Sequence, residues 1–341
     1  HGHLDSWGEG IGDNATGDAT LLELARVLQA NQSSLTRSVR IAWWSGHSHG
    51  RYAGSTWYAD AFGLDLMDHC VAQVNCDSPG CRWATEYRDL SVMPELVDFT
   101  SAVIRDVTGQ EAQTERPLRA GDYSFNNLGI SGTLMLSSTM PQAVADEHGY
   151  YAVGGCGGNI AWHTVDDTIE IADRDNLARD IEVYGTIVWR LANMPVLPLD
   201  IAAAGTALRE SVAGYASTLG ARFDLTEALA AADALITAAN AFQRGAINGE
   251  GASAATNAHN EALLRAGRLL TNLSYAQRGF FRQDAALDVP PIPDLAAATG
   301  AFSAAELGGA AADVAHISLL RARNRVIWTL REAARELRTA S

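Results

Sequence analysis

The first fourteen residues, HGHLDSWGEGIGDN, bring together side chains that can bind metal ions. His3 offers an imidazole nitrogen, and Asp13 offers two carboxylate oxygens that can bridge a pair of cations. Asp5 can hold the His3 ring in place by a hydrogen bond from outside the metal site. This spacing predicts one half of a two-metal hydrolytic site.

Three further segments carry metal-compatible side chains. They are GHSHG, with His47 and His49, NCD, which ends at Asp77, and HTVDDT, which begins at His163. With the first motifs, they supply enough histidine and carboxylate ligands for two zinc ions about 3.5 to 4 Å apart. Any one of these segments alone could be a polar stretch with no role in metal binding. Their number and order favour a single two-metal site.

The elements that must position these side chains have an α/β pattern up to Pro198. A helix is predicted from Gly17 through LLELARVL, and further helices near 94–107 and 169–192. Strands are predicted at 39–44, 70–75 and 133–137. Open α/β sheets bind ligands in the loops beyond their strand ends, and the candidate side chains lie in such loops.

The composition changes after residues 195–198 to alanine-rich segments with regularly spaced leucines. Helices are predicted at 202–219, 225–243, 254–273 and 307–339, and the late ones are separated by the breaks DVPPIPDL and TGAFSAAELGG. These segments predict a helical bundle whose apolar stripes pack internally or form a dimer face. The chain therefore divides into a catalytic part, residues 1–198, and a helical part, residues 199–341.

Charge and composition exclude several classes of function. The 341 residues carry a formal net charge of -15, which excludes nucleic acid and an anionic membrane surface as main partners, because both require a basic face. All 25 basic residues are arginine, so chemistry that needs a lysine is excluded. No apolar run reaches the roughly 18 to 20 residues that cross a bilayer.

Four cysteines are too few for a disulfide scaffold in a chain of this size. Cys76 and Cys81 are close enough in sequence to close a small loop that contains Asp77. Three interpretations stay open for them: a disulfide bond, an extra metal ligand, or buried thiols.

The ordered motifs resemble those of the co-catalytic zinc aminopeptidases, a family that includes bacterial leucyl aminopeptidases. GHLDSW, GDNATGDATLLELARVL, NCDSPG, WHTVDDT and GDYSFNNLGI look like its successive motifs, as does the segment that ends at Ser55. The segment YAQRGFFRQDAALDVPPIPDL looks like the dimerisation region of the glutamate carboxypeptidase II and transferrin-receptor branch. The resemblance implies a three-layer α/β/α fold with a mixed sheet, then a helical bundle that forms a homodimer.

By position, the resemblance implies that His3, Asp13 and Asp77 hold one metal ion, and that Asp13 and His163 contribute to the second. Asp5 would orient His3. A metal ligand so close to the first residue also predicts upstream polypeptide, either processed away or supplied as a second chain, that holds the first strands and part of the pocket walls.

One motif departs from the family pattern. Members carry two consecutive glutamates, a general base and a metal ligand, where this chain has His47 and Ser48, followed by His49. In one alternative, His47 replaces the base. In another, His47 or His49 replaces the lost ligand. In the third, the second metal is lost and the protein binds a partner without hydrolysis, as in the transferrin-receptor branch.

The retained ligands and the two added histidines favour a working site. We predict a metallohydrolase that cleaves an amide or peptide bond with metal-activated water, two divalent ions with zinc as the default, His47 as the base and His49 as a further ligand. Trp162, Arg51 and Tyr52 are expected to contact a small-molecule or peptide substrate. The alternatives are a non-catalytic binding protein and a metal-dependent enzyme with a small non-peptide substrate.

Overall fold

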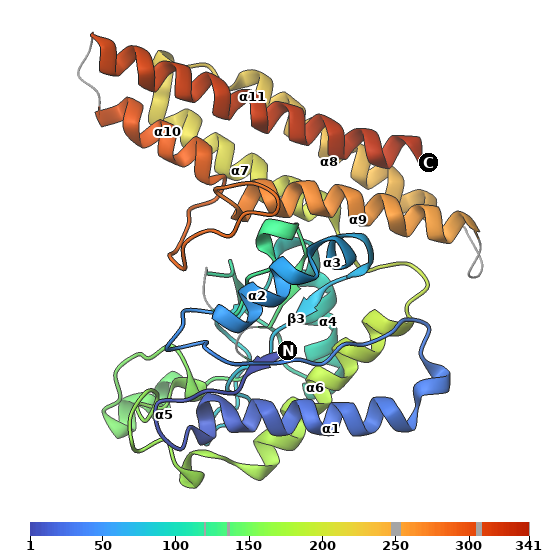
Figure 1. The fold of residues 1–341 in the computed structure, drawn as a ribbon, viewed down its shortest axis with the longest axis vertical. Helices are drawn as coiled ribbons and strands as arrows, with labels where there is room; N and C mark the ends of the chain where they lie inside the picture. The colour runs from blue at the N-terminus through green and yellow to red at the C-terminus, as the bar shows by residue number, and fades with distance from the viewer. Residues whose placement is uncertain (119–120, 135–136, 247–253, 305–308, 341) are drawn as a thin grey trace. The chain divides into compact units, whose positions relative to one another are not determined.

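The computed structural model describes residues 1–118, 121–134, 137–246, 254–304 and 309–340, which form two compact units (Figure 1). The first unit consists of His1–Gly63, Ala72–Phe125 and Gly132–Met194. The second consists of Leu64–Val71, Asn126–Ser131 and Pro195–Ser341. The division near residue 195 lies close to the boundary proposed at residue 198, but two short segments from within the predicted catalytic part belong to the second unit.

The described strands of the first unit form three short parallel pairs, each a two-stranded sheet. The pairs are β1 (Gly2–His3) with β2 (Trp43–Trp44), β3 (Gln73–Val74) with β6 (Gly132–Thr133), and β4 (Leu90–Ser91) with β5 (Thr114–Glu115). Backbone contacts join the pairs, because the Cys76 N–H donates to the His1 carbonyl at 2.7 Å and Val92 bridges Thr133 in the antiparallel sense. These single contacts link three two-stranded parallel sheets of the described residues.

The helices of the first unit pack beside these strands. Both α1 (Thr16–Ala30) and α4 (Val97–Thr108) pack against α6 (Arg174–Asn193), and α2 (Ala53–Ala61) packs against β2. The short helix α5 (Gln142–His148) has no fully buried residue. A π-helical turn covers Ile11–Ala15. Single 3₁₀-helical turns cover Gln32–Ser34, Pro94–Leu96, Cys156–Gly158 and Ile169–Ile171. The predicted α/β class is confirmed.

The core face of α1 follows its sequence pattern. Leu21, Leu24 and Leu28 recur at helical spacing and are all buried. The strands are shorter than predicted, because only two residues of each predicted segment at 39–44 and 70–75 form regular pairs. The predicted strand at 133–137 lies partly outside the described residues.

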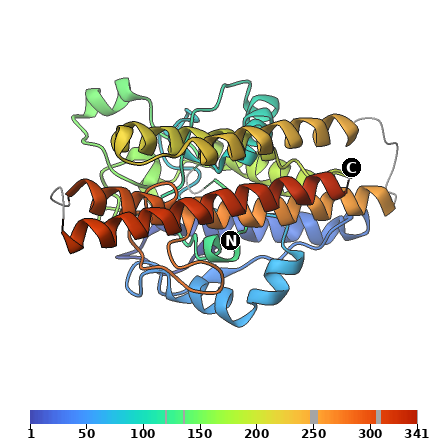
Figure 2. The ribbon, with the colours of Figure 1, turned by 90° about the horizontal axis from the view of Figure 1, so that it is seen from above.

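The second unit is a helical bundle whose helices run side by side (Figure 2). It contains α7 (Ile201–Leu219), α8 (Thr226–Ala246), α9 (Ala254–Tyr275), α10 (Pro293–Ala304) and α11 (Ala310–Thr339), with a turn at Gly220–Arg222. Most of α3 (Gly63–His69) and the turn Asn126–Leu128 also belong to this unit. Within the described ranges, no helix is both long enough and apolar enough to cross a membrane.

One predicted break in the bundle is shorter than expected. The segment TGAFSAAELGG was expected to separate the last helices, but its residues up to Ala304 belong to α10. Residues 305–308 lie outside the described residues, and α11 begins after Gly309. Pro293 fits the first turn of a helix, where its missing N–H leaves no bond unmade, and the alanines that follow favour helix. Leu295 and Ala298 then bury the inner face of α10.

Candidate metal centre

Four predicted metal ligands from distant segments lie together in the first unit. Nε2 of His3 lies 2.8 Å from Oδ1 of Asp13 and 3.5 Å from Oδ2 of Asp77. Nε2 of His163 lies 3.1 Å from the other oxygen of Asp13. The Asp13 carboxylate therefore lies between two imidazoles, with one imidazole on each oxygen. A carboxylate that bridges two metal ions needs this arrangement.

The backbone around Asp13 is held from two sides. The carboxylate of Asp167 accepts the N–H groups of Gly12 and Asp13 at 2.7 and 3.0 Å. On the other side, the Asn14 amide donates to the Cys76 carbonyl at 2.9 Å and accepts the Ser78 N–H at 2.9 Å. Asn14 thereby connects the Asp13 turn to the loop that carries Asp77, a role that sequence reasoning missed.

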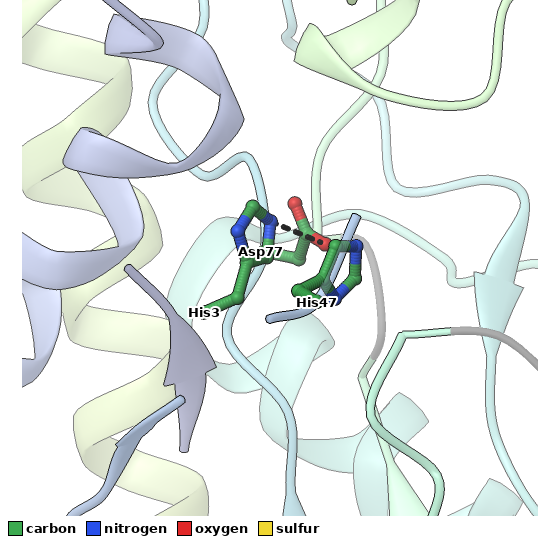
Figure 3. A group of neighbouring side chains, drawn as sticks. All are labelled: His3, His47 and Asp77. Atoms are coloured by element: carbon green, nitrogen blue, oxygen red, sulfur yellow. Dashed lines mark ion pairs between the residues drawn. The ribbon is translucent and has the colours of Figure 1, made fainter. Parts of the chain in front are cut away.

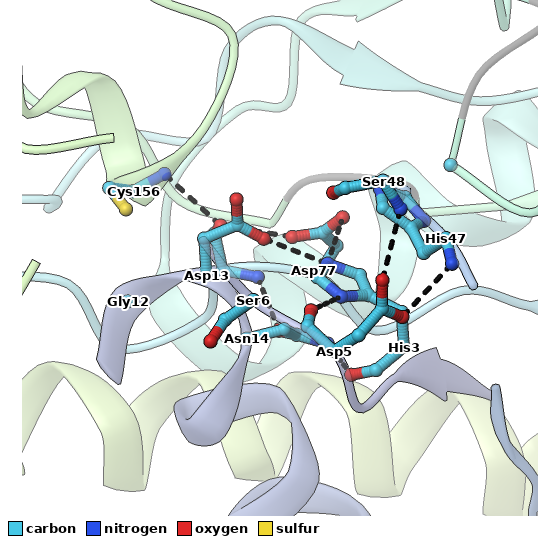
Figure 4. A network of polar contacts seen from close by, with 12 residues as sticks. His3, Asp5, Ser6, Gly12, Asp13, Asn14, His47, Ser48, Asp77 and Cys156 are labelled. Carbon is cyan, nitrogen blue, oxygen red and sulfur yellow. Dashed lines mark hydrogen bonds and ion pairs between the residues drawn. The ribbon is translucent and has the colours of Figure 1, made fainter. Parts of the chain in front are cut away.

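Asp5 connects the His3 strand to the GHSHG loop. Its backbone carbonyl lies 2.8 Å from Nδ1 of His3, while its carboxylate accepts the N–H groups of His47 and Ser48 at 2.9 and 3.2 Å (Figure 4). The prediction that the Asp5 side chain orients His3 is therefore corrected. The backbone makes that contact, because the carboxylate is turned toward the loop and fixes it instead.

His47 lies beside the candidate ligands. Its ring stacks on that of His3, with 3.8 Å between ring centroids and 14° between planes. One ring nitrogen each from His3 and His47 and one carboxylate oxygen of Asp77 all lie within 4.8 Å of one another (Figure 3). Nδ1 of His47 lies 2.7 Å from Oδ2 of the buried Asp122. The sequence did not point to Asp122 as part of the site, although the motif GDYSF contains it.

The remaining predicted site residues lie either at the exposed edge of the centre or packed against His47. The His49 side chain is 58% exposed and lies 3.5 Å from the Asp5 carboxylate. Nδ1 of His49 faces the Asp5 carboxylate rather than a candidate metal ligand, and its assignment as a metal ligand stays a prediction. Tyr52 is buried with its ring edge on His47, 5.0 Å between centroids, so it supports His47 and does not reach a substrate.

Two predicted substrate contacts remain at the rim. Trp162 stacks on His163 at 3.8 Å between ring centroids, and the exposed Arg51 lies over the ring of Tyr52. Trp7, which is 52% exposed, adds an aromatic face beside His49 and His163. The accessible edge of the centre is therefore largely aromatic.

The electrostatics of the centre suit a cation. Burial lowers the pKa of His3, but the carboxylates of Asp77 and Asp13 outweigh burial and raise that pKa to about 12. Burial likewise raises the pKa of Asp13, but His163 and His3 outweigh it and hold the pKa well below its usual range. Imidazole nitrogens and carboxylate oxygens together are a donor set that zinc accepts.

His3 also shows an unsatisfied atom where a metal ion would bind. Its Nε2 is buried and, within the described residues, makes no hydrogen bond of ordinary geometry, although Asp13 is close. Buried nitrogen atoms rarely lack a partner. The residues present therefore fit a divalent metal ion at this position.

This arrangement predicts proton release when metal binds. In the metal-free protein at neutral pH, His3 is protonated because its pKa is raised to about 12, and a metal ion must displace that proton. Apparent zinc affinity should therefore rise with pH, by about tenfold per unit for one displaced proton. Calorimetric titration in buffers of different ionisation enthalpy measures the number released, and a value near zero at pH 7 contradicts the prediction.

The cysteines are all free thiols. Cys76, Cys81 and Cys156 are buried, and burial raises the pKa of Cys76 far above its usual range. The Cys81 thiol donates to the Ser78 carbonyl at 3.4 Å. Of the three interpretations that the sequence left open, buried thiols agree with this structure.

A mixed α/β unit with a carboxylate between two imidazoles is typical of two-metal hydrolases. The family model for peptidase family M28 matches residues 1–187, more than half of the chain, and the chain belongs to that family. The family resemblance drawn from the motifs is confirmed.

Two curated relatives show how far the similarity extends. A probable glutamate carboxypeptidase VP8 from Zea mays is 27% identical over 225 residues, which cover 62% of this chain and 30% of the relative. Leupeptin-inactivating enzyme 1 from Streptomyces exfoliatus is 24% identical over 203 residues, which cover 58% of this chain and 45% of the relative. The chain thus spans less than half the length of either relative.

Solved structures of aminopeptidases are also similar. A zinc aminopeptidase from Bacillus subtilis has 21% identity and a TM-score of 0.45, with 57% of this chain and 45% of that chain covered. An aminopeptidase from Aneurinibacillus sp. strain AM-1 has 21% identity and a TM-score of 0.43, with 56% and 42% covered.

Proposed function

We propose that this protein is a metallohydrolase that cleaves an amide or peptide bond with water activated by two divalent metal ions, zinc by default. The observation that carries the proposal is the Asp13 carboxylate between His3 and His163. Membership of peptidase family M28 supports peptide hydrolysis. The names of the relatives, a glutamate carboxypeptidase and a leupeptin-inactivating enzyme, support a peptide or peptide-like substrate.

Each side chain has a role in this proposal. His3, Asp13 and Asp77 would hold one ion, and Asp13 with His163 the other. Bound zinc supplies Lewis-acid activation of water and stabilises negative charge on the substrate carbonyl oxygen. His47 accepts a proton from the attacking water and returns it to the leaving amine. Trp162 and Arg51 contact the substrate at the rim.

Metal removal tests the proposal. Dialysis against a chelator should abolish hydrolysis of a panel of aminoacyl and peptidyl amides, and zinc should restore it with close to two ions per chain. Metal analysis and initial rates measure both quantities on the same samples. Hydrolysis that persists after complete metal removal, or a folded protein that takes up no zinc at micromolar concentrations, would overturn the proposal.

Two expectations about partners remain proposals. A homodimer through the helical unit is supported by exposed apolar side chains on α11, Val314, Ile317 and Trp328, which a second copy can cover. A second polypeptide that completes the substrate pocket is likewise a proposal. The retained ligands disfavour the alternative of a non-catalytic binding protein.

A further inference from the structure

His47 and Asp122 form an imidazole–carboxylate pair at the base of the GHSHG loop. Nδ1 of His47 lies 2.7 Å from Oδ2 of Asp122. Asp122 is fully buried, and the His47 side chain is 12% exposed. The partners are 75 residues apart in sequence, so the contact depends on the folded unit.

The Asp122 carboxylate is itself held in place. Its other oxygen accepts the hydroxyl of Ser55 at 2.7 Å, and the Ser55 hydroxyl lies 2.8 Å from that of Ser124. All three of these residues are buried. A buried carboxylate with both oxygens engaged keeps a fixed orientation, so it can orient the ring that it contacts.

We infer that Asp122 is a positioning residue that fixes His47 in the tautomer with hydrogen on Nδ1. An ionised carboxylate only accepts hydrogen bonds, so Nδ1 of His47 must donate, and the lone pair of the neutral ring then lies on Nε2. The rings of His3 and Tyr52 contact two further sides of the imidazole and restrict its rotation. Nε2 is thereby left as the nitrogen that takes up a proton.

This role rests on the proposed function, because it matters only if His47 is the base. In that step, the Nε2 lone pair takes one proton from water while the water oxygen bonds to the substrate carbonyl carbon. Asp122 stabilises the positive charge on the ring meanwhile. When the C–N bond breaks, the same proton moves from Nε2 to the amine nitrogen and His47 is neutral again.

The need for a positioning residue follows from the substitution at position 47. The glutamate that the family pattern places there has two equivalent oxygens and no tautomers. An imidazole in its place offers its lone pair on either nitrogen, and only one of them can face the substrate. Asp122 removes that ambiguity.

Asp122→Asn is the direct test. An asparagine amide can donate to Nδ1, which moves the ring hydrogen to Nε2 and removes the basic lone pair. We expect kcat to fall by about 10² to 10⁴ with little change in KM or zinc content. The Asp122→Glu variant should recover part of the loss. Asp65→Asn is the matched control, because Asp65 contacts the exposed His69 at 3.2 Å in a similar pair.

Two further readouts separate positioning from a general structural role. In a His47→Ala background, Asp122→Asn should cause little additional loss of activity. In protein with ¹⁵N-labelled histidine, the wild type should show hydrogen on Nδ1 of His47, and the Asp122→Asn variant should not. An equal loss of activity in both backgrounds, or hydrogen on Nε2 of His47 in the wild type, would overturn the inference.

The NMR measurement also separates this inference from the proposed function, since it needs neither substrate nor turnover. A wild type with hydrogen on Nδ1 of His47 but no activity on any amide refutes the function and leaves the positioning contact supported. An active wild type with the opposite tautomer refutes the positioning role alone. If Asp122→Asn fails to fold, the wild-type spectrum still decides.

Discussion

Replacing Asp13 with alanine is expected to remove both metal ions and to lower hydrolytic activity by at least about 10³-fold. Each oxygen of this carboxylate faces a different imidazole, His3 at 2.8 Å and His163 at 3.1 Å. Its loss therefore weakens both ion sites together. It also leaves two closely spaced cations without the anion that separates them.

The test of Asp13 needs the metal content as well as the rate. Zinc-to-protein ratios should fall from close to two to near zero in Asp13→Ala, whereas circular dichroism should keep the wild-type spectrum. Asp146→Ala, which changes a carboxylate on α5, is the control and should keep both zinc and activity. An Asp13→Ala protein that retains two zinc ions would show that this carboxylate does not bridge them.

Replacing His47 with alanine is expected to lower kcat by about 10² to 10⁴ while zinc content stays close to two. The ring lies against His3 and within 4.8 Å of the His3–Asp77 ligand atoms, so it is near enough to exchange a proton with water there. The exposed His49 is expected to be replaceable by alanine with a change in rate of no more than a few-fold.

Measured zinc content decides between the two roles that the GHSHG loop left open for His47. If His47→Ala loses one zinc ion along with activity, His47 is a ligand and the assignment as base is wrong. If His49→Ala loses as much activity as His47→Ala, His49 acts at the metal centre.

The sequence could bring the candidate metal ligands together because their signal is local. His3, Asp13, Asp77 and His163 each lie in a short motif whose residue types bind metal. The residues that hold this site in place could not be predicted in the same way. Asp122 reaches His47 across 75 residues, and Asn14 reaches the Cys76 carbonyl across 62. Neither contact leaves a pattern along the chain, so only the folded unit shows it.

The sequence did not give the directions of the His49 and Tyr52 side chains. His49 and Tyr52 lie within five residues of His47, and residue type alone made them candidates for the site. The Asp5 carboxylate holds the backbone of His47 and Ser48, which leaves His49 at the surface and Tyr52 packed beneath His47. The fold class depended on apolar periodicity and was predictable, whereas the exact extent of each strand was not.

In the helical unit, the helix propensity of the sequence predicted most of the structure. Its long helices follow alanine-rich segments with spaced leucines and were predicted closely. Pro293 lies in the predicted break DVPPIPDL but begins α10, because a helix tolerates proline in its first turn.

The most direct test of the two-metal centre is a crystal structure of the zinc-loaded protein with anomalous scattering data at the zinc edge. We predict two peaks about 3.5 to 4 Å apart, with Asp13 between them. One peak should lie beside His3 and Asp77, and the other beside His163. A single peak, or none within coordination distance of Asp13, would contradict the account.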